Sequence, residues 1–416
     1  MDQSYIHFNP TISKDYAAAW INRLRKFLLS QDLKVIVILA LIVAAISFPI
    51  YYYRINYPVD SDFGLHMLFT RYMIRGEFNR IPNYTLAHPG LQLILTTSYW
   101  LTMRKLPIGF MHAAWMSVAQ IVTAVVLYFW LEGGEQKNIR RRLRALFAVT
   151  LTMIAPITLL ALHDGYFYFG YITLVNFHNP TVILVRPLAL LSFILIVSSM
   201  EKQSSSKSIL FHAGLVFLSA LIKPSYLVCI LPAFIVLSAW QFIHHKHVDM
   251  RMLVLGFLIP AVFVLGVQFS ITYFTDGEEG GISILPLEVE SHFSGYLLPK
   301  FLLSILFPLI VLVFNLHALR QNNSIKLAWV GFLFGVAQMY LLAESGDRLY
   351  DGNFRWGAQI MSFLLFSASV RWIMSALCGN EVSWRYSKWP ITLAYVAHLL
   401  AGITYYVRSF ILTTYF

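Results

Sequence analysis

Charged residues are scarce in this chain. Asp, Glu, Lys and Arg make up only 12% of the 416 residues, whereas 58% are hydrophobic. Soluble domains carry about 25% charged and about 45–50% apolar residues. The composition therefore excludes a soluble domain and predicts an all-α polytopic membrane protein. Aromatic residues reach 16%, which suits the aromatic belts at the two bilayer surfaces.

Cysteine is nearly absent as well. The two cysteines, Cys229 and Cys378, lie in or beside apolar segments, so no disulfide framework is predicted. No His/Cys spacing matches a zinc site. The formal charge of +11 is attributed to Lys and Arg that hold loops on the cytoplasmic side, so we expect the lipid bilayer and no nucleic acid as a partner.

The apolar runs predict about eleven transmembrane helices, each needing about 20 mainly apolar residues. Residues 1–32 are polar and basic, and they are expected to form a cytoplasmic amphipathic leader rather than a cleavable signal peptide. Residues 33–416 are expected to form one transmembrane domain. The predicted spans lie near 33–53, 110–131, 145–162, 181–199, 209–222, 226–243, 252–274, 296–316, 327–343, 355–377 and 389–412.

Basic residues set the predicted orientation. The run KNIRRRLR at 137–144 has five basic residues and no acid, so it belongs in the cytoplasm. Residues 88–103 must then form a helix at the outer surface rather than a span. The N-terminus lies inside, and we expect the plasma (inner) membrane or an equivalent compartment. The external loops follow at 54–109, 163–180, 275–295 and 344–354.

The first external loop is long and carries reactive side chains. The stretch DSDFGLH places Asp60, Asp62 and His66 directly after the first span, and AHPG adds His88. If residues 62–66 are helical, Asp62 and His66 lie on one face at i,i+4 spacing. An Asp at a helix start is also an ordinary stabiliser of the helix dipole. The two carboxylates could share a proton or a divalent cation; no other cofactor is expected.

Cations near the outer ends of later spans form a second group of candidates. Arg186 and Lys223 interrupt apolar runs, where ionisable residues usually face a cavity or a partner. The segments on either side of Lys223 are short, so the KPSY turn should be recessed. A lysine at a span end can also simply reach for the interface. The last external loop, ESGDRLYDGNFR, contributes Arg348, Asp351 and Arg355.

The arrangement resembles the GT-C superfamily of integral-membrane glycosyltransferases. VDSDFGLH stands where these enzymes carry an acidic motif after the first span, and AHPGLQLIL is similar to the element that opens their surface-lying helix. The resemblance is clearest over residues 33–144. Here a serine separates the two acids, and the signature of oligosaccharyltransferases is missing, which argues against block transfer to protein.

The resemblance implies transfer of a sugar from a polyprenyl-phosphate donor to a cell-envelope glycan or glycolipid on the non-cytoplasmic face, with inversion suspected. It implies that Asp62, or else Asp60, is the catalytic base. The expected substrate-binding residues, drawn from the resemblance and the charge pattern, are His66, His88, Arg186, Lys223, Arg348, Asp351 and Arg355. The alternatives are a lipid-linked saccharide polymerase or ligase on the same face, and a membrane transporter or flippase.

Overall fold

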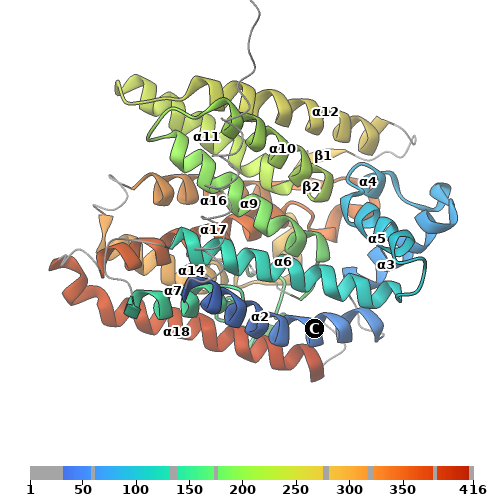
Figure 1. Cartoon of the computed structure of the whole chain (residues 1–416), viewed down its shortest axis with the longest axis horizontal. Coiled ribbons are helices and arrows are strands. Elements are labelled where there is room, and N and C mark those ends of the chain that lie inside the picture. Colours follow the sequence, from blue (N-terminus) through green and yellow to red (C-terminus); the bar gives the residue numbers. More distant parts are fainter. Residues whose placement is uncertain are drawn as a thin grey trace, which may run out of the picture.

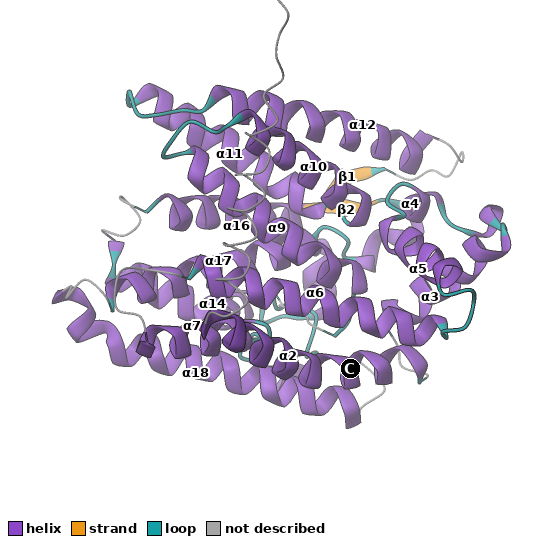
Figure 2. Cartoon of the chain, viewed as in Figure 1, coloured by secondary structure: helices purple, strands orange, loops and turns teal. Residues whose placement is uncertain are grey.

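The computed structural model describes residues 31–57, 61–131, 138–172, 177–274, 281–316, 322–377 and 382–411. Within these ranges the chain is a bundle of long helices (Figures 1 and 2). Nine of the helices described there are long and apolar enough to cross a membrane. The prediction of an all-α, multi-pass membrane protein is confirmed at that level. Asp60, Cys378 and the leader 1–30 lie outside the described residues.

The long helices follow the apolar runs of the sequence closely. The helix α17 (Arg355–Ala376) is buried along almost its whole length, so it forms the centre of the bundle. The π-helical η2 (Met252–Leu258) runs directly into α12 (Ile259–Phe274). The other long helices are α2 (Gln31–Asn56), α6 (Ile108–Trp130), α9 (Pro180–Ser199), α11 (Ser225–Ile243), α14 (Leu297–Phe314), α16 (Asn323–Leu341) and α18 (Val382–Ile411).

Two of the eleven predicted spans are not among these nine helices. The helix α10 covers Ser206–Ile222, 17 residues. Residues 145–162 do not form one helix, because α7 (Asn138–Leu151) ends early and non-helical chain runs to Leu160. The backbone of that buried chain bonds to other helices: the N–H of Ala155 donates to the carbonyl of His398 at 3.2 Å, and that of Ile157 to Leu303 at 3.2 Å. Pro156 has no N–H to satisfy. An apolar run can therefore lie inside the bundle without being helical.

Short elements gather at one end of the bundle. The predicted surface helix is present as α5 (Gly90–Leu101), and it packs against α3 (Asp62–Arg75). These two helices and α4 (Asn83–Leu86) lie together beside a small sheet (Figure 1). Its strands, β1 (Ile282–Ile284) and β2 (Leu342–Glu344), are antiparallel and were not predicted. Three-residue strands carry too little alternation to be recognised from sequence.

Candidate functional site

The start of α3 presents the Asp62 carboxylate. Ser61 is the N-cap but makes no side-chain capping bond, and Asp62 lies in the first turn, where the helix dipole favours a negative charge. Asp62 Oδ2 accepts a hydrogen bond from Asn179 Nδ2 at 2.6 Å, and His178 Nε2 lies 3.7 Å away. The side chain is 31% exposed. One carboxylate oxygen is thus held in place while the group stays accessible.

Asn179 is fixed by the beginning of α9. It is the N-cap residue, and Pro180 follows at the first helical position, where proline is favoured. Its Oδ1 accepts from the N–H groups of Thr181 and Val182 at 3.0 and 3.1 Å, and from the Thr181 hydroxyl at 2.6 Å. These bonds leave only one orientation for the amide, with Nδ2 directed at Asp62. Asn179 was not among the predicted site residues, although Asn-Pro before an apolar run is a recognisable helix start.

Lys223 brings a cation to the same region. It lies between α10 and α11 and is only 8% exposed, and its ammonium stands 4.7 Å from the centroid of the Trp356 ring. Burial lowers the pKa of Lys223 to about 8, although the negative charges of Asp62 and Glu344 oppose that shift. Among the residues described, no carboxylate lies within 4 Å of this ammonium. The cation is held by an aromatic face rather than by a counter-charge.

Aromatic stacking links Lys223 to Asp62. The ring of His178, which faces Asp62, stacks on Trp356 at a centroid distance of 5.8 Å and an interplanar angle of 18°. Trp356 is the second residue of the central helix α17 and in turn carries Lys223. Tyr168 lies against His178 at 4.7 Å. We refer to Asp62, His66, His88, His178, Asn179, Lys223 and Trp356 as the Asp62–Lys223 cluster.

Two histidines from the segment between α2 and α5 complete the cluster. Gln92 Nε2 donates to His66 Nδ1 at 2.8 Å, so His66 carries its proton on Nε2. Burial, aided by the charge of Lys223, lowers the pKa of His66 to about 4, although Asp62 opposes this shift, and lowers that of His88 to about 3. Both rings are neutral at pH 7. His88 Nδ1 is buried without a hydrogen-bond partner among the described residues.

Gly90 explains how the segment before α5 comes close to Lys223. A Cβ at this position would lie 2.7 Å from the carbonyl oxygen of Leu221, on the last turn of α10. Only glycine permits such close packing of the two backbones. The amide of Gln268 adds a second tie, since its Nε2 donates to the carbonyls of Ala87 and Ala220. His88 is thereby held next to the turn that carries Lys223.

Arg348 and Asp351 lie beside the cluster as an ion-paired group. Arg348 contacts Glu344 at 3.1 Å and Asp351 at 3.6 Å, and its guanidinium lies 4.3 Å from the centroid of the Tyr84 ring. Asn353 Nδ2 also donates to Glu344 at 2.5 Å. The charge of Arg348 is thus already compensated, unlike that of Lys223. Burial and the nearby carboxylates, Asp62 among them, raise the pKa of Tyr84.

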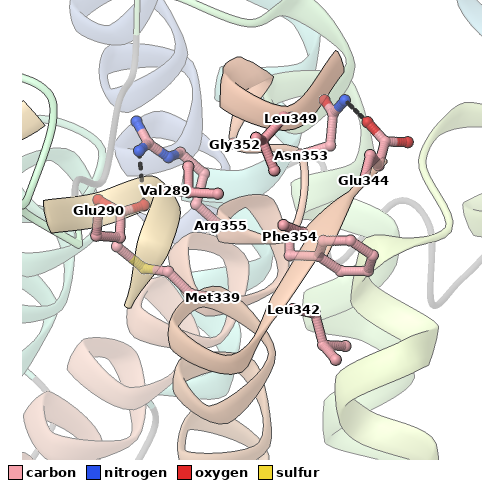
Figure 3. Close-up of a pocket in the computed structure, with 11 residues that line it drawn as sticks. Val289, Glu290, Met339, Leu342, Glu344, Leu349, Gly352, Asn353, Phe354 and Arg355 are labelled. Carbon is pink, nitrogen blue, oxygen red and sulfur yellow. Dashed lines mark hydrogen bonds and ion pairs between the residues drawn. The ribbon is translucent and has the colours of Figure 1, made fainter. Parts of the chain in front are cut away.

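Arg355 directly precedes Trp356 in α17 and is buried in an ion pair. Its Nη2 contacts Glu290 Oε1 at 2.6 Å, both side chains are 1% exposed, and the guanidinium lies 4.3 Å from the Phe169 ring centroid. Figure 3 shows this pair and the Asn353–Glu344 bond lining one narrow pocket. Arg186 lies elsewhere, fully buried in α9, with its guanidinium 5.3 Å from the Phe363 ring centroid. The structure therefore groups the predicted residues Asp62, His66, His88, Lys223, Arg348 and Asp351. It places Arg355 next to this group, through Tyr168 and the pocket shared with Glu344, and separates Arg186 from it.

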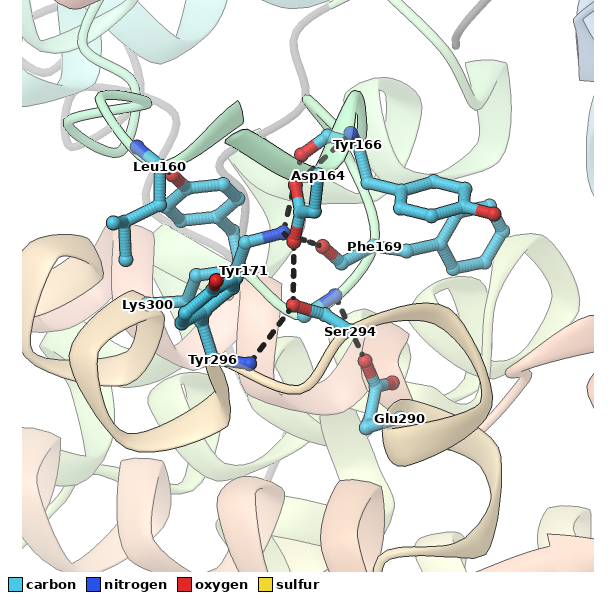
Figure 4. A network of polar contacts seen from close by, with 10 residues as sticks. Leu160, Asp164, Tyr166, Phe169, Tyr171, Glu290, Ser294, Tyr296 and Lys300 are labelled. Atoms are coloured by element: carbon cyan, nitrogen blue, oxygen red, sulfur yellow. Dashed lines mark hydrogen bonds and ion pairs between the residues drawn. The ribbon is translucent and has the colours of Figure 1, made fainter. Parts of the chain in front are cut away.

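A polar network fixes the loop that precedes His178 (Figure 4). Lys300, completely buried in α14, contacts Asp164 Oδ2 at 2.6 Å and donates to the carbonyl of Phe169 at 3.1 Å. Ser294 Oγ donates to the same Asp164 oxygen at 2.6 Å. The N–H of Gly170 donates to Glu290 Oε2 at 3.1 Å. The loop is therefore tied to the pair formed by Glu290 and Arg355.

Within the described part of the chain, no group of three or more His, Cys, Asp or Glu side chains could hold a metal ion. The suggested partner of Asp62 in cation binding, Asp60, lies outside the described residues. The fold and the cluster define the chain as a multi-pass membrane protein with an acid, a buried lysine and neutral histidines at one end of its bundle. Compared with models of known families, with curated proteins and with solved structures, the chain matches none of them.

Proposed function

We propose that the chain is a membrane glycosyltransferase that moves a sugar from a polyprenyl-phosphate donor to a hydroxyl of a cell-envelope glycan or glycolipid. One observation carries the proposal. The Asp62 carboxylate, oriented by Asn179, shares a cluster with the Lys223 ammonium, which has no carboxylate within 4 Å among the described residues. A base for the acceptor and an unneutralised cation for the leaving phosphate are the two charges that such a transfer needs.

The reaction assigns one task to each group. The acceptor hydroxyl oxygen bonds to the anomeric carbon, and the bond from that carbon to the phosphate oxygen breaks, so polyprenyl phosphate leaves with the electron pair. The hydroxyl proton goes to Asp62, on the oxygen that Asn179 does not hold. Lys223 stabilises the charge of the leaving phosphate. The Nε2–H of His66 is a neutral donor for a phosphate or sugar oxygen.

Burial of Lys223 strengthens its interactions. Lys223, at the joint between two apolar helices, is kept from water, and a charge in such surroundings interacts far more strongly than in water. An amphiphilic donor can place its prenyl chain in the bilayer and its phosphate at this depth. The proposal puts the cluster on the external or periplasmic face of the plasma membrane, because the basic loops mark the opposite ends of the helices as cytoplasmic.

A transporter or flippase is the second candidate, and one feature favours it. The non-helical chain runs buried within the bundle from 152 to 157, and transporters commonly line their substrate path with interrupted helices. That segment contacts α14 and α18 rather than the Asp62–Lys223 cluster. A polymerase or ligase of lipid-linked saccharides would use the same cluster, and it is distinguished by its product, a chain of many sugars instead of one.

The experiment uses membranes containing the full chain and a panel of radiolabelled polyprenyl-phosphate monosaccharides. The proposal expects label in a glycan or glycolipid fraction with one of these donors and a loss of at least about a hundredfold in Lys223→Gln, since hydrogen bonds to charged groups contribute about 1.5–3 kcal/mol and more when charge develops in the transition state. Absence of transfer with every donor, together with donor movement across the bilayer in a flipping assay, would replace the glycosyltransferase by the flippase.

A further inference from the structure

A second group of cations lies at the opposite end of α11. Lys223 precedes the first turn of this helix, whereas Trp240 lies near its last turn. The Lys246 ammonium is 4.5 Å from the centroid of the Trp240 ring, and the Lys326 ammonium is 5.1 Å from the same ring. The His244 ring also packs on Trp240, at 4.5 Å. We call Trp240, His244, Lys246 and Lys326 the Trp240 site.

The chain is bent back to bring Lys246 over the indole. The N–H of Lys246 donates to the carbonyl of Gln241 at 2.9 Å, and that of His245 donates to Phe242 at 3.1 Å, which is the Schellman pattern of a helix C-terminus. This turn needs a left-handed residue, and His245 supplies it at φ 52°. Glycine normally occupies such a position, since other side chains are strained there. The structure therefore holds Lys246 close to Lys326 at a cost to the backbone.

Lys326 is placed unfavourably for a cation. It lies in the first turn of α16, which follows the N-cap Asn322, and the helix dipole disfavours a positive charge there. Lys246 adds a like charge against the same ring. Among the described residues, no carboxylate lies within 4 Å of either ammonium. The neighbouring Asp249 is 2% exposed and accepts from Gln203, Ser204 and Met252 instead.

We propose that the Trp240 site binds the phosphate of an anionic membrane lipid. An anion between Lys246 and Lys326 relieves their mutual repulsion and compensates the charge at the start of α16. A lipid is favoured over a soluble anion because Phe242 and Ile243, which directly precede the turn, are 72% and 70% exposed. These apolar side chains offer contact to acyl chains beside the headgroup. Basic pockets between helices at a membrane surface bind lipid headgroups in this way.

The test compares lipid binding to the purified full chain by native mass spectrometry. Phosphatidylglycerol and phosphatidylcholine with identical acyl chains are titrated into the wild type, the double variant Lys246→Gln/Lys326→Gln and the matched control Lys202→Gln/Lys207→Gln. The control removes the same charge from exposed lysines that make no contact with Trp240. We expect one phosphatidylglycerol to bind the wild type and the control alike, and the double variant to bind it at least roughly tenfold more weakly, because each lysine near an anionic lipid is worth about a factor of five.

Each other outcome overturns the proposal. Equal weakening in the control would mean a general charge effect, and equal binding of phosphatidylcholine would mean that the phosphate charge is not recognised. Displacement of the lipid by millimolar inorganic phosphate would identify a site for free anions. A second test uses hydrogen exchange and needs only the wild type. The amides of residues 241–247 should be better protected in nanodiscs of phosphatidylglycerol than in nanodiscs of phosphatidylcholine. Equal protection in the two lipids would contradict binding of an anionic lipid at the Trp240 site.

Discussion

Asn179 Nδ2 donates to Asp62 Oδ2 at 2.6 Å across 117 residues of sequence. The same amide caps α9 through its Oδ1, so the position of the Asp62 carboxylate depends on the start of a membrane-spanning helix. A residue that orients a base in this way is a positioning residue. It should affect the rate of transfer without touching the substrate.

Replacing Asn179 separates its two tasks. In Asn179→Ser the hydroxyl can still cap the helix, because serine is as good an N-cap as asparagine, but the donor to Asp62 is lost. We expect kcat to fall roughly tenfold to a hundredfold with KM for the donor and the melting temperature nearly unchanged. Asn179→Ala should lose kcat similarly and also about 1 kcal/mol of unfolding free energy. A serine variant with full kcat would show that Asn179 has only a capping role.

The charge of Lys223 should matter for binding and not for folding. Lys223→Gln removes a buried cation that has no carboxylate within 4 Å among the described residues, so the chain should be as stable as the wild type or more stable. The same change should weaken binding of the polyprenyl-phosphate donor by roughly tenfold to a hundredfold. Donor binding by isothermal titration and thermal unfolding of the same preparation measure both effects. Unchanged affinity together with a large loss of stability would make Lys223 a structural residue.

Arg355 is expected to behave in the opposite way. It is paired with Glu290 where both side chains are 1% exposed, so Glu290→Gln leaves an uncompensated buried charge and should cost about 3–5 kcal/mol of unfolding free energy. The double variant Glu290→Gln/Arg355→Met should recover part of that loss, because neither charge remains. Denaturant unfolding measures the coupling. If Arg355→Met instead raises KM for the donor at wild-type stability, Arg355 binds the phosphate, as the sequence suggested.

The buried histidines predict how stability depends on pH. The pKa of His66 is lowered to about 4 and that of His88 to about 3 by burial, whereas an exposed histidine has about 6.5. Below pH 6.5 the unfolded chain binds protons that these buried rings do not. Their contribution to stability is therefore complete above pH 6.5 and is lost progressively as the pH falls, down to about 4 for His66 and about 3 for His88.

Thermal melting between pH 7.5 and 4.5 tests this dependence. His66→Gln/His88→Gln should flatten the decline toward acid pH, whereas His247→Gln, at an exposed position, should leave it as in the wild type. A double variant with the wild-type slope would place the acid-sensitive groups elsewhere. Donor phosphate binding should raise both pKa values, so donor affinity should increase as the pH falls from 7 toward 5.

Local features of the site could be predicted from the sequence, and contacts between distant segments could not. Asp62 and His66 share a face of α3 because their spacing is four residues, which is a property of the helix itself. Lys223 was predicted from its place between two short apolar runs, and its side chain is buried in the structure. The bond from Asn179 to Asp62 and the sheet pairing of Ile282 with Glu344 depend on how the bundle packs, so no local sequence pattern predicts them.

The unwound segment at 152–160 shows the same limit. Its composition suits a span, and the hydrogen-bond partners that allow it to leave the helix, the carbonyls of His398 and Leu303, come from two distant helices. Arg186 was predicted from its charge within an apolar run and Arg355 from its place at the end of the last loop, but a sequence cannot tell which buried cation already has its counter-charge. Glu290 supplies it for Arg355, and Lys223 has none within 4 Å among the described residues.

The central claim is that Asp62 accepts the proton of the acceptor hydroxyl. The most direct measurement is transfer from radiolabelled polyprenyl-phosphate sugars in native membranes. It compares the wild type with Asp62→Asn, Asp60→Asn and the control Asp347→Asn. Asp347 is an exposed acid between β2 and α17. The account predicts at least a thousandfold loss in Asp62→Asn with normal donor binding, and near wild-type transfer in the control. Undiminished transfer by Asp62→Asn would contradict it, and a loss confined to Asp60→Asn would assign the base to Asp60.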